Sequence, residues 1–326
     1  MNKILKIFLV ALFAVVGFAF ADAALAGGDN DAEDDISSEV AQSGSSNSGD
    51  AVGGQVVGVV SAGDASVDAT NRSEDVDIET GDTTAENDLE QEVGQENTSG
   101  GENELDGGDI ESSVAQDASA ASGDGVGGSV IGVVTSAGGS ADVVAANTSE
   151  DVDIETGDAT AFNFLDADVG QGNFGGGGEN DAEDDISFDA AQAVSAATGD
   201  GVGGQVLGIV SAGDASVDAT NESTDVDVST GDAYAENDAE YEVGQEIDGD
   251  DNFSDGEISS ELAQDASSNS GDAVAGQVAG VVTSAGGSAD LVLANTSEDV
   301  DGESGDADFV NESEEFVGQQ IEDGGN

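Results

Sequence analysis

Short segments of this chain alternate regularly between apolar and polar positions. In Ile36–Gln42, the even-numbered residues share one face of an extended chain and the odd-numbered residues share the other. A period of two is typical of a β-strand with one buried face, and no segment shows the 3.6-residue apolar period of an amphipathic helix. The pattern therefore predicts an all-β protein.

The same alternating segments return at nearly constant intervals. A Gly-Asp pair ends at Asp50, Asp124, Asp200 and Asp272, and the intervals are 74, 76 and 72 residues. Internal repetition at a fixed period indicates a stacked array rather than independent domains. We therefore predict four repeats of about 74 residues, at 27–98, 99–175, 176–248 and 249–326.

One run in each repeat departs from the alternation. The run that begins at Gln55 (QVVGVV) is apolar on both faces, and equivalent runs begin at Ser129, Gln205 and Gln277. Such a run predicts a strand that is covered on both sides. The glycine at its centre, Gly58 in the first repeat, predicts a close approach by a neighbouring backbone.

The inward positions of the alternating segments carry mainly small side chains. Ala, Ser, Val and Gly are too small to fill a wide core, but they suit a narrow core in which coils stack about 4.8 Å apart. The predicted architecture is a β-solenoid or stacked β-arch array of four repeats. A row of small tandem β-sandwiches is the alternative.

The first 26 residues differ in character from the rest of the chain. Lys3 and Lys6 precede an apolar run from Ile7 to Ala21, and Ala24-Leu25-Ala26 is a small-x-small motif. This order is typical of a secretory signal peptide that is cleaved before Gly27. The apolar run is short for a membrane span. We therefore predict a secreted protein, extracellular or at the cell surface, with no membrane insertion after cleavage; a retained anchor is the alternative.

The charge of the chain is extremely one-sided. The formal net charge is −70, and removal of residues 1–26 would leave 72 acidic residues against Arg72 alone, a net charge of −71. Nucleic acids and anionic lipids require a basic surface, so the chain is not expected to bind them. Divalent cations are the expected small partners. Adaptation to high salt is an alternative explanation, and disorder is another.

Acidic residues recur around a turn in each repeat, where Thr156-Gly157-Asp158 is one example and the Asp is expected to bond its own backbone. Calcium takes six to eight oxygen ligands, and it would reverse the repulsion between stacked carboxylates. Calcium is therefore the candidate cofactor. The candidate ligands are Asp75, Asp77, Glu79, Asp82, Asp151, Asp153, Glu155, Asp158, Asp225, Asp227, Asp232, Asp299, Asp301 and Asp306.

Amide side chains also recur at fixed positions. An N-x-Ser sequon stands at the same place in every repeat, so glycosylation is one interpretation and an inward or turn-forming asparagine is the other. These asparagines are Asn71, Asn147, Asn221 and Asn295. Glutamines at inward strand positions predict hydrogen-bonded ladders along the stacking direction. These glutamines are Gln42, Gln95, Gln116, Gln171, Gln192, Gln245, Gln264 and Gln319.

Two segments resemble the repeats of secreted functional amyloids of the curlin type. They are the segment from Gln42 to Asn47 and, more loosely, the segment from Gln264 to Ala273, where Gln, Gly, Asn and Ala follow at similar steps. Curlin repeats are shorter and less acidic. The design is also similar in style to amyloid-like sheath and filament proteins of prokaryote surfaces. The resemblance implies a secreted subunit that polymerises through β stacking.

The predicted function is that of a structural protein. Histidine and cysteine are absent and no carboxylate is singled out by its context, so we do not expect an enzyme. Neither end of the repeat array carries a distinct cap, which predicts end-to-end or lateral self-assembly into a filament, sheath or surface layer. A monomeric calcium-dependent surface adhesin and an acidic matrix protein are the alternatives.

Overall fold

The computed structural model describes residues 10–22, 30–32, 35–99, 103–105, 108–135, 139–175, 179–182, 184–249, 251–254, 256–283 and 287–323. Within this part of the chain every regular element is a β-strand, and no helix is long and apolar enough to cross a membrane. The strands form five sheets, and every strand pairing is parallel. The all-β prediction is therefore confirmed.

Each sheet collects the same strand from successive repeats. The strands that run along the first arm belong to two sheets. One sheet contains β3 (Ile36–Asn47), β9 (Ile110–Ala121), β15 (Ile186–Ala197) and β20 (Ile258–Asn269). Its partner sheet contains β1 (Val10–Asp22), β7 (Thr83–Ser99), β13 (Ala159–Gly175), β18 (Ala233–Gly249) and β23 (Ala307–Asp323).

The other arm is built in the same way. One sheet contains β4 (Ala51–Val52), β5 (Gln55–Ser61), β10 (Gly125–Val126), β11 (Ser129–Thr135), β16 (Gly201–Ser211) and β21 (Ala273–Thr283). The facing sheet contains β6 (Ala65–Glu79), β12 (Ala141–Glu155), β17 (Ala215–Ser229) and β22 (Ala289–Glu303). A small sheet at the tip contains β2 (Asn30–Ala32), β8 (Asn103–Leu105), β14 (Glu179–Ala182) and β19 (Asp251–Ser254).

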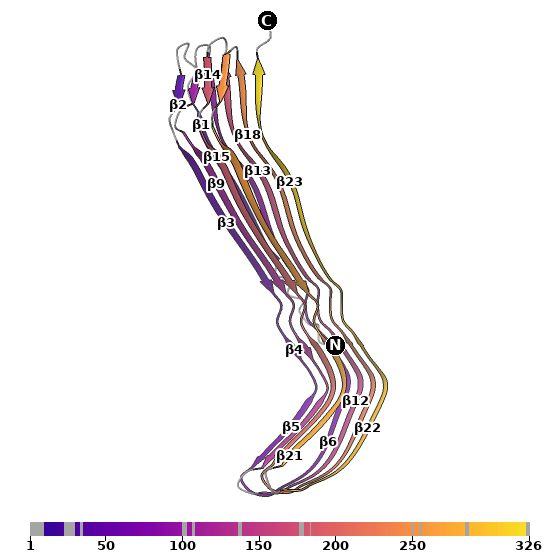
Figure 1. Ribbon diagram of the computed structural model, residues 1–326. Coiled ribbons are helices and arrows are strands. Elements are labelled where there is room, and N and C mark those ends of the chain that lie inside the picture. Colours follow the sequence, from indigo (N-terminus) through magenta and orange to yellow (C-terminus); the bar gives the residue numbers. More distant parts are fainter. Residues whose placement is uncertain are drawn as a thin grey trace.

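One repeat therefore makes one flattened layer of the stack. In Figure 1 the chain runs along the first arm, rounds the far end of the second arm and returns beside itself, before the next repeat begins on top of it. Tandem β-sandwiches would pair strands within a repeat, whereas these strands pair between repeats. The prediction of a β-solenoid or stacked β-arch array is thus confirmed, and the tandem β-sandwiches are excluded.

The register of the stack follows the repeat spacing found in the sequence. Ile186 lies opposite Ile110 on one side and Ile258 on the other. Turns follow the same rule, because the N–H of Ala51 donates to the carbonyl of Asp124 at 2.8 Å. Ladders of this kind satisfy the backbone groups of strands and turns alike.

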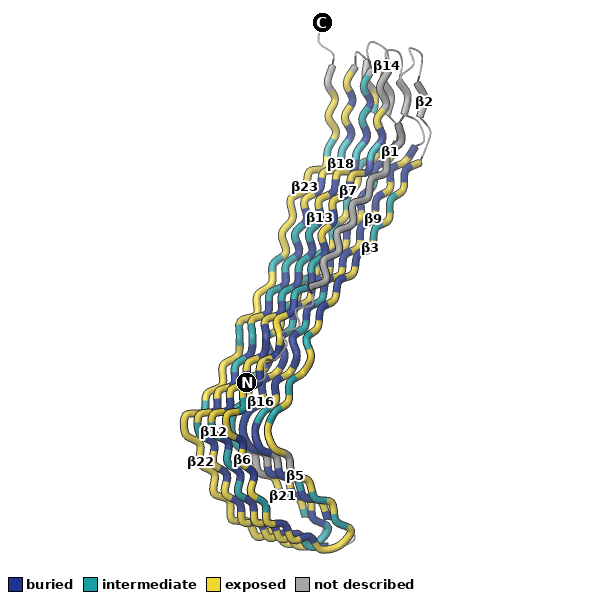
Figure 2. Tube along the Cα trace, turned by 180° about the vertical axis from the view of Figure 1, so that it is seen from behind, coloured by how far each residue is buried: buried dark blue, intermediate teal, exposed yellow. Residues whose placement is uncertain are grey.

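Narrow apolar clusters lie between the facing sheets of each arm. In the first arm, Ile110 and Leu89 are fully buried, together with Phe188. In the second arm, Ile131 and Val143 pack between their two sheets. Figure 2 shows the buried residues inside the stack and the exposed residues on its rims and on its outermost layer.

In the facing sheet of the second arm, the inward positions switch parity at an aspartate with a left-handed backbone. Asp75 has φ = 52°, and Asp151, Asp225 and Asp299 repeat this conformation. Short polar side chains tolerate this region, which most residues avoid. Inward positions change from odd numbers, as at Ser73, to even numbers, as at Ile78. The break in alternation at Ser73-Glu74-Asp75-Val76 was the available sequence signal.

The two expectations about the apolar run are wrong. The second face of the run is open to solvent, where the exposed fractions are 84% for Val60, 41% for Val134, 47% for Val210 and 61% for Val282. A Cβ added at Gly58 would meet nothing within 4 Å. The close approach occurs instead at Gly128, where φ is +119° and a Cβ would lie 1.8 Å from the carbonyl oxygen of Gly204.

The predicted signal peptide overlaps one described strand. β1 pairs with β7 so that Val10 lies opposite Thr84 and Asp22 lies opposite Glu96. This offset of 74 residues matches the offsets of 74 to 76 residues between the other strands of the sheet, and β1 therefore occupies the place of a preceding layer. The predicted cleavage position between Ala26 and Gly27 lies outside the described residues.

Candidate functional site

The first glutamine ladder lies inside the arm formed by β3 and β7. Gln116 Nε2 donates to Gln42 Oε1 (3.0 Å), Gln192 Nε2 to Gln116 Oε1 (2.9 Å) and Gln264 Nε2 to Gln192 Oε1 (2.8 Å). Each of these amides also donates to a carbonyl of the facing strand, as Gln42 does to Asp88 (3.1 Å). The ladder thus ties layers together and ties the two sheets of each layer together.

The second glutamine ladder lies near the tip of the same arm. Gln171 Nε2 donates to Gln95 Oε1 (3.4 Å) and Gln245 Nε2 to Gln171 Oε1 (2.8 Å). Gln319 continues the ladder by donating to Gln245. The structure therefore brings the eight predicted glutamines together in two columns, and all are buried except Gln264 and Gln319 in the last layer.

The sequon asparagines face inward. The exposed fraction of Asn71, Asn147 and Asn221 is 2% or less. Asn147 Nδ2 donates to Asn221 Oδ1 (3.0 Å), and Asn221 Nδ2 donates to Asn295 Oδ1 (2.8 Å). The nitrogen that would carry a glycan is the donor of these bonds, so the geometry favours the inward-ladder interpretation.

A further asparagine ladder was missed in the sequence. Asn87 Nδ2 donates to Asn163 Oδ1, Asn163 Nδ2 to Asn237 Oδ1 and Asn237 Nδ2 to Asn311 Oδ1, each at 2.9 Å. The first three of these amides also donate to a carbonyl of the facing strand in the next layer, as Asn87 does to Asp117 (2.8 Å). The signal was present, because these asparagines recur at an inward position of one strand.

The aspartates at the turns serve as caps between layers. The Asp158 side chain was expected to bond its own backbone, but its Oδ1 accepts from the N–H of Asp232 in the next layer. In the same way the N–H of Asp158 donates to Asp82 Oδ1 of the previous layer (3.1 Å). Asp232 and Asp306 repeat the bond at 2.8 Å. Four of the candidate calcium ligands therefore form one hydrogen-bonded column through the layers. They are Asp82, Asp158, Asp232 and Asp306.

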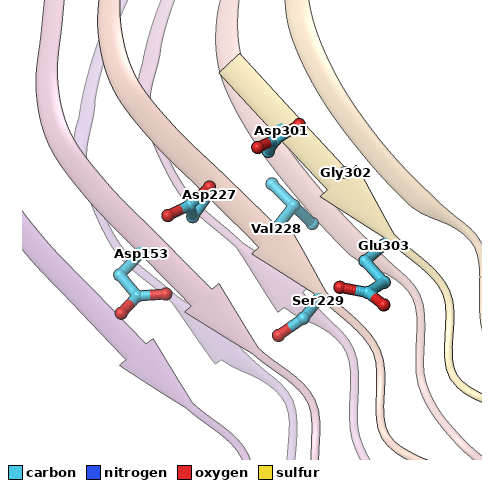
Figure 3. A pocket seen from close by; sticks show the side chains of 7 residues that line it. All are labelled: Asp153, Asp227, Val228, Ser229, Asp301, Gly302 and Glu303. Carbon is cyan, nitrogen blue, oxygen red and sulfur yellow. The ribbon is translucent and has the colours of Figure 1, made fainter. Parts of the chain in front are cut away.

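The remaining candidate ligands form exposed columns on the outside of the second arm. Figure 3 shows Asp153, Asp227 and Asp301 on the successive strands β12, β17 and β22. Together with Val228, Ser229, Gly302 and Glu303 they line a hollow of about 540 Å³. Asp75, Asp77, Glu79, Asp151, Glu155, Asp225 and Asp299 are likewise outside the core.

The electrostatics of these columns are unfavourable without counterions. Carboxylates stacked about 4.8 Å apart repel one another by about 0.9 kcal/mol per pair in water. Among the described residues, no group of three or more Asp and Glu side chains is already arranged to hold a metal ion. Calcium at these columns therefore stays a prediction.

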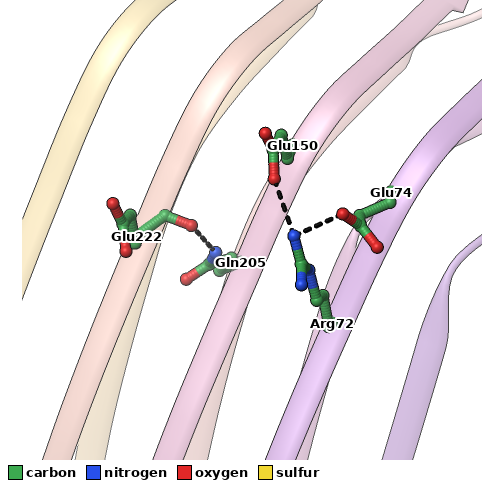
Figure 4. Close-up of polar contacts among 5 residues, drawn as sticks. All are labelled: Arg72, Glu74, Glu150, Gln205 and Glu222. Carbon is green, nitrogen blue, oxygen red and sulfur yellow. Dashed lines mark hydrogen bonds and ion pairs between the residues drawn. The ribbon is translucent and has the colours of Figure 1, made fainter.

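The single base of residues 27–326 bridges two layers. Arg72 Nη2 contacts Glu74 of its own strand and Glu150 Oε2 of the next strand, the latter at 3.0 Å (Figure 4). Gln205 donates to the backbone carbonyl of Glu222 nearby. Arg72 is 55% exposed, and exposed ion pairs contribute little to stability.

The pKa values of two aspartate carboxyl groups are shifted from the ordinary value, in opposite directions. Partial desolvation, and then the neighbouring Asp166, raise the pKa of Asp168 although its side chain keeps solvent contact. The backbone N–H of Ser288, and then its hydroxyl, lower the pKa of Asp214. Asp214 Oδ1 accepts both bonds at 2.8 Å, so this carboxylate joins the third and fourth layers.

The last layer exposes a face that the other layers bury. Phe309, Val317 and Ile321 of β23 are 63%, 38% and 47% exposed, whereas Val243 of β18 is fully buried. Leu291 and Leu293 of β22 are also exposed. No described element covers this face, so its strand edges and inward side chains are open.

Comparisons with known proteins returned no match among family models, curated proteins or solved structures.

Proposed function

We propose that this chain is a secreted structural protein whose copies stack end to end into an extracellular filament, sheath or surface layer. The observation that carries the proposal is the uncovered face of the last layer. An open edge of a parallel sheet is a template for another strand, and solenoids that stay monomeric need a polar terminal cap. Here the terminal strands β22 and β23 carry exposed large apolar side chains instead.

The chemistry of the layers supports a structural role. Each layer offers backbone ladders and amide ladders that continue with the same spacing from one layer to the next. Hydrogen bonds between stacked side-chain amides and between in-register strands hold fibrous β assemblies together. The resemblance of Gln42–Asn47 to curlin-type repeats points to the same kind of function.

Cations would control this assembly. Stacking two copies extends every carboxylate column, and each new pair adds repulsion between like charges. Salt screens part of that repulsion, and calcium bound between neighbouring carboxylates reverses it. We therefore propose that divalent cations stabilise the polymer.

Negative-stain electron microscopy of residues 27–326 tests the proposal, with calcium, with a chelator, and with sodium chloride at matched ionic strength. Uniform filaments or tubes are expected with calcium. Separate rods of constant length in all three conditions would contradict self-assembly and favour a monomeric adhesin. Filaments of equal amount in calcium and in sodium would retain the polymer but reject specific binding of calcium.

A variant of one acidic column tests how that column affects the calcium requirement of assembly. Replacing Asp153, Asp227 and Asp301 by Asn removes repulsion along one exposed column without touching the core. Filaments of this variant should form at a lower calcium concentration than filaments of the unmodified chain. The matched control replaces Asp142, Ser216 and Asp290, another column of β12, β17 and β22, by Asn, and it should shift the requirement less because fewer charges are lost.

A further inference from the structure

The asparagine ladder has a direction. In each of its three bonds the amide nitrogen donates to the amide oxygen of the next layer. The first oxygen of the ladder, Asn87 Oδ1, is fully buried and receives no hydrogen bond from any described residue. At the other end, Asn311 Nδ2 has no acceptor in the described part of the chain. The asparagine ladder thus has an unused acceptor at its first layer and an unused donor at its last layer, among the described residues.

The glutamine ladder runs in the opposite direction. Each Nε2 donates to the layer before it, so the unused groups are reversed. Gln264 Oε1, in the last layer, accepts no hydrogen bond from any described residue. Gln42 Nε2 has two hydrogens and gives one to Asp88, while no described residue accepts the other.

We propose that copies join head to tail, with β23 of one copy on β7 of the next and β20 of one copy on β3 of the next. Asn311 then donates to Asn87 Oδ1, and Gln42 donates to Gln264 Oε1. The junction repeats the register found inside the chain, in which Val317 would lie opposite Val93. This inference rests on the proposed self-assembly and specifies its geometry.

The opposite polarity of the two ladders selects this arrangement. A tail-to-tail pair would place Asn311 donors against each other and Gln264 acceptors against each other, leaving both unpaired. Unpaired polar groups in a contact are a common source of specificity. A head-to-tail contact is heterologous and does not close on itself, so it produces a filament.

While residues 1–26 are present, β1 occupies the edge of β7 that the junction needs. Its backbone pairs along Thr84–Glu96, with Phe13 opposite Asn87. The β1 sequence VALFAVVGFAFAD contains no Asn or Gln, so it offers no side-chain amide that could continue the ladder. A second copy offers the same backbone pairing and the missing donor in addition. Removal of residues 1–26 therefore opens the receiving end.

Disulfide trapping tests the junction directly, because the chain has no cysteine of its own. We would introduce V93C and V317C into the full chain, with a specific protease site between Ala26 and Gly27. In-register neighbours in adjacent strands have Cα atoms about 4.8 Å apart, which a disulfide can span. Oxidation of the folded chain should give no covalent multimers before cleavage and a series of multimers after it.

Controls make each outcome decisive. V317C alone should give no dimer, and a dimer would overturn the polarity. V93C with F309C, which are about 26 Å out of register, should give no multimers. Equal cross-linking of the uncleaved chain would overturn the role of β1. Filaments without cross-links would reject this junction but keep the proposed function, whereas absence of both would reject both.

A single-atom change tests the ladder itself. Asn311→Asp keeps the oxygen that accepts from Asn237 but replaces the donor that the next copy requires. Such a chain adds once to a filament and then blocks that end, so mean filament length should fall in inverse proportion to its mole fraction. Gln320→Glu makes the same change on the outward face of β23, where it would lie opposite Glu96 of the next copy. At saturating calcium, which offsets the added repulsion, it should leave filament length unchanged. Equal shortening by both variants would overturn the proposed bond.

Discussion

The third and fourth repeats fold into the same strands but differ in what they bury. In β15 every second residue is buried, whereas in β20 the equivalent residues are only half-buried. In β17 the inward residues are buried, and in β22 nearly all residues are exposed. The two repeats have the same internal pattern, so the difference comes from the layer that follows. Burial in this protein is therefore a property of the stack and not of the repeat.

The glycine column offers the largest expected contrast between an inner and an outer layer. Gly128→Ala would place a Cβ 1.8 Å from the backbone oxygen of Gly204, whereas at Gly276 a Cβ would meet nothing within 4 Å. Both have positive φ and share the conformational cost. We expect a loss of about 4 kcal/mol or more for Gly128→Ala and about 1–3 kcal/mol for Gly276→Ala. Urea unfolding measures both; equal losses would contradict the close approach.

The isoleucine column should show the next largest contrast. Ile186 is fully buried between Ile110 and Ile258, and Ile258 is only partly buried. Ile186→Ala should cost about 2–5 kcal/mol through lost burial and a remaining cavity. Ile258→Ala should cost about 1 kcal/mol as a monomer. If stacking covers Ile258, its cost should rise toward that of Ile186 in calcium-assembled samples.

The asparagine ladder tests the same contrast with polar groups. Asn163 donates to Asn237 and to the carbonyl of Ala193 and accepts from Asn87. Asn163→Asp should cost about 2–3 kcal/mol because buried acceptors lose their donor. Asn311→Asp should cost less than about 0.5 kcal/mol in the monomer. Thermal unfolding of both variants at low protein concentration measures the difference, and similar losses would contradict the ladder.

The smallest effects concern pH. Ser288 lowers the pKa of Asp214 below the ordinary aspartate value of 3.8. The Asp214 carboxylate therefore stabilises the folded state above that value, and this stabilisation is lost as pH falls through the lowered pKa. The pKa of Asp168 is raised, so its ionisation opposes folding once pH rises above 3.8. Asp214→Asn should flatten the loss of stability on the acid side, and Asp168→Asn should improve stability at neutral pH. Unfolding midpoints at neutral and acidic pH check both signs.

The candidate site was predictable where a residue type recurs at a fixed strand position. The inward glutamines, such as Gln116 and Gln192, follow from alternation and repeat spacing alone. The Asn87 ladder obeyed the same rule and could have been found by it. The aspartate caps could not, because Asp82 bonds the N–H of Asp158, and this requires the turns of two layers to lie directly on each other.

The sequence by itself determined the strand character of the repeats and their spacing, whereas the structure decided that the strands pair between repeats, parallel and in register. The strand character and the spacing follow from local periodicity and from the identity of residues about one repeat apart, which any aligned stacking brings together. Only the tertiary structure decided that one face of the Gln55–Val60 run is open, that the inward positions switch parity at Asp75, and that the asparagine and glutamine ladders point in opposite directions. Each of these depends on which atoms of a distant layer or facing sheet lie nearby, and a one-dimensional pattern does not contain that information.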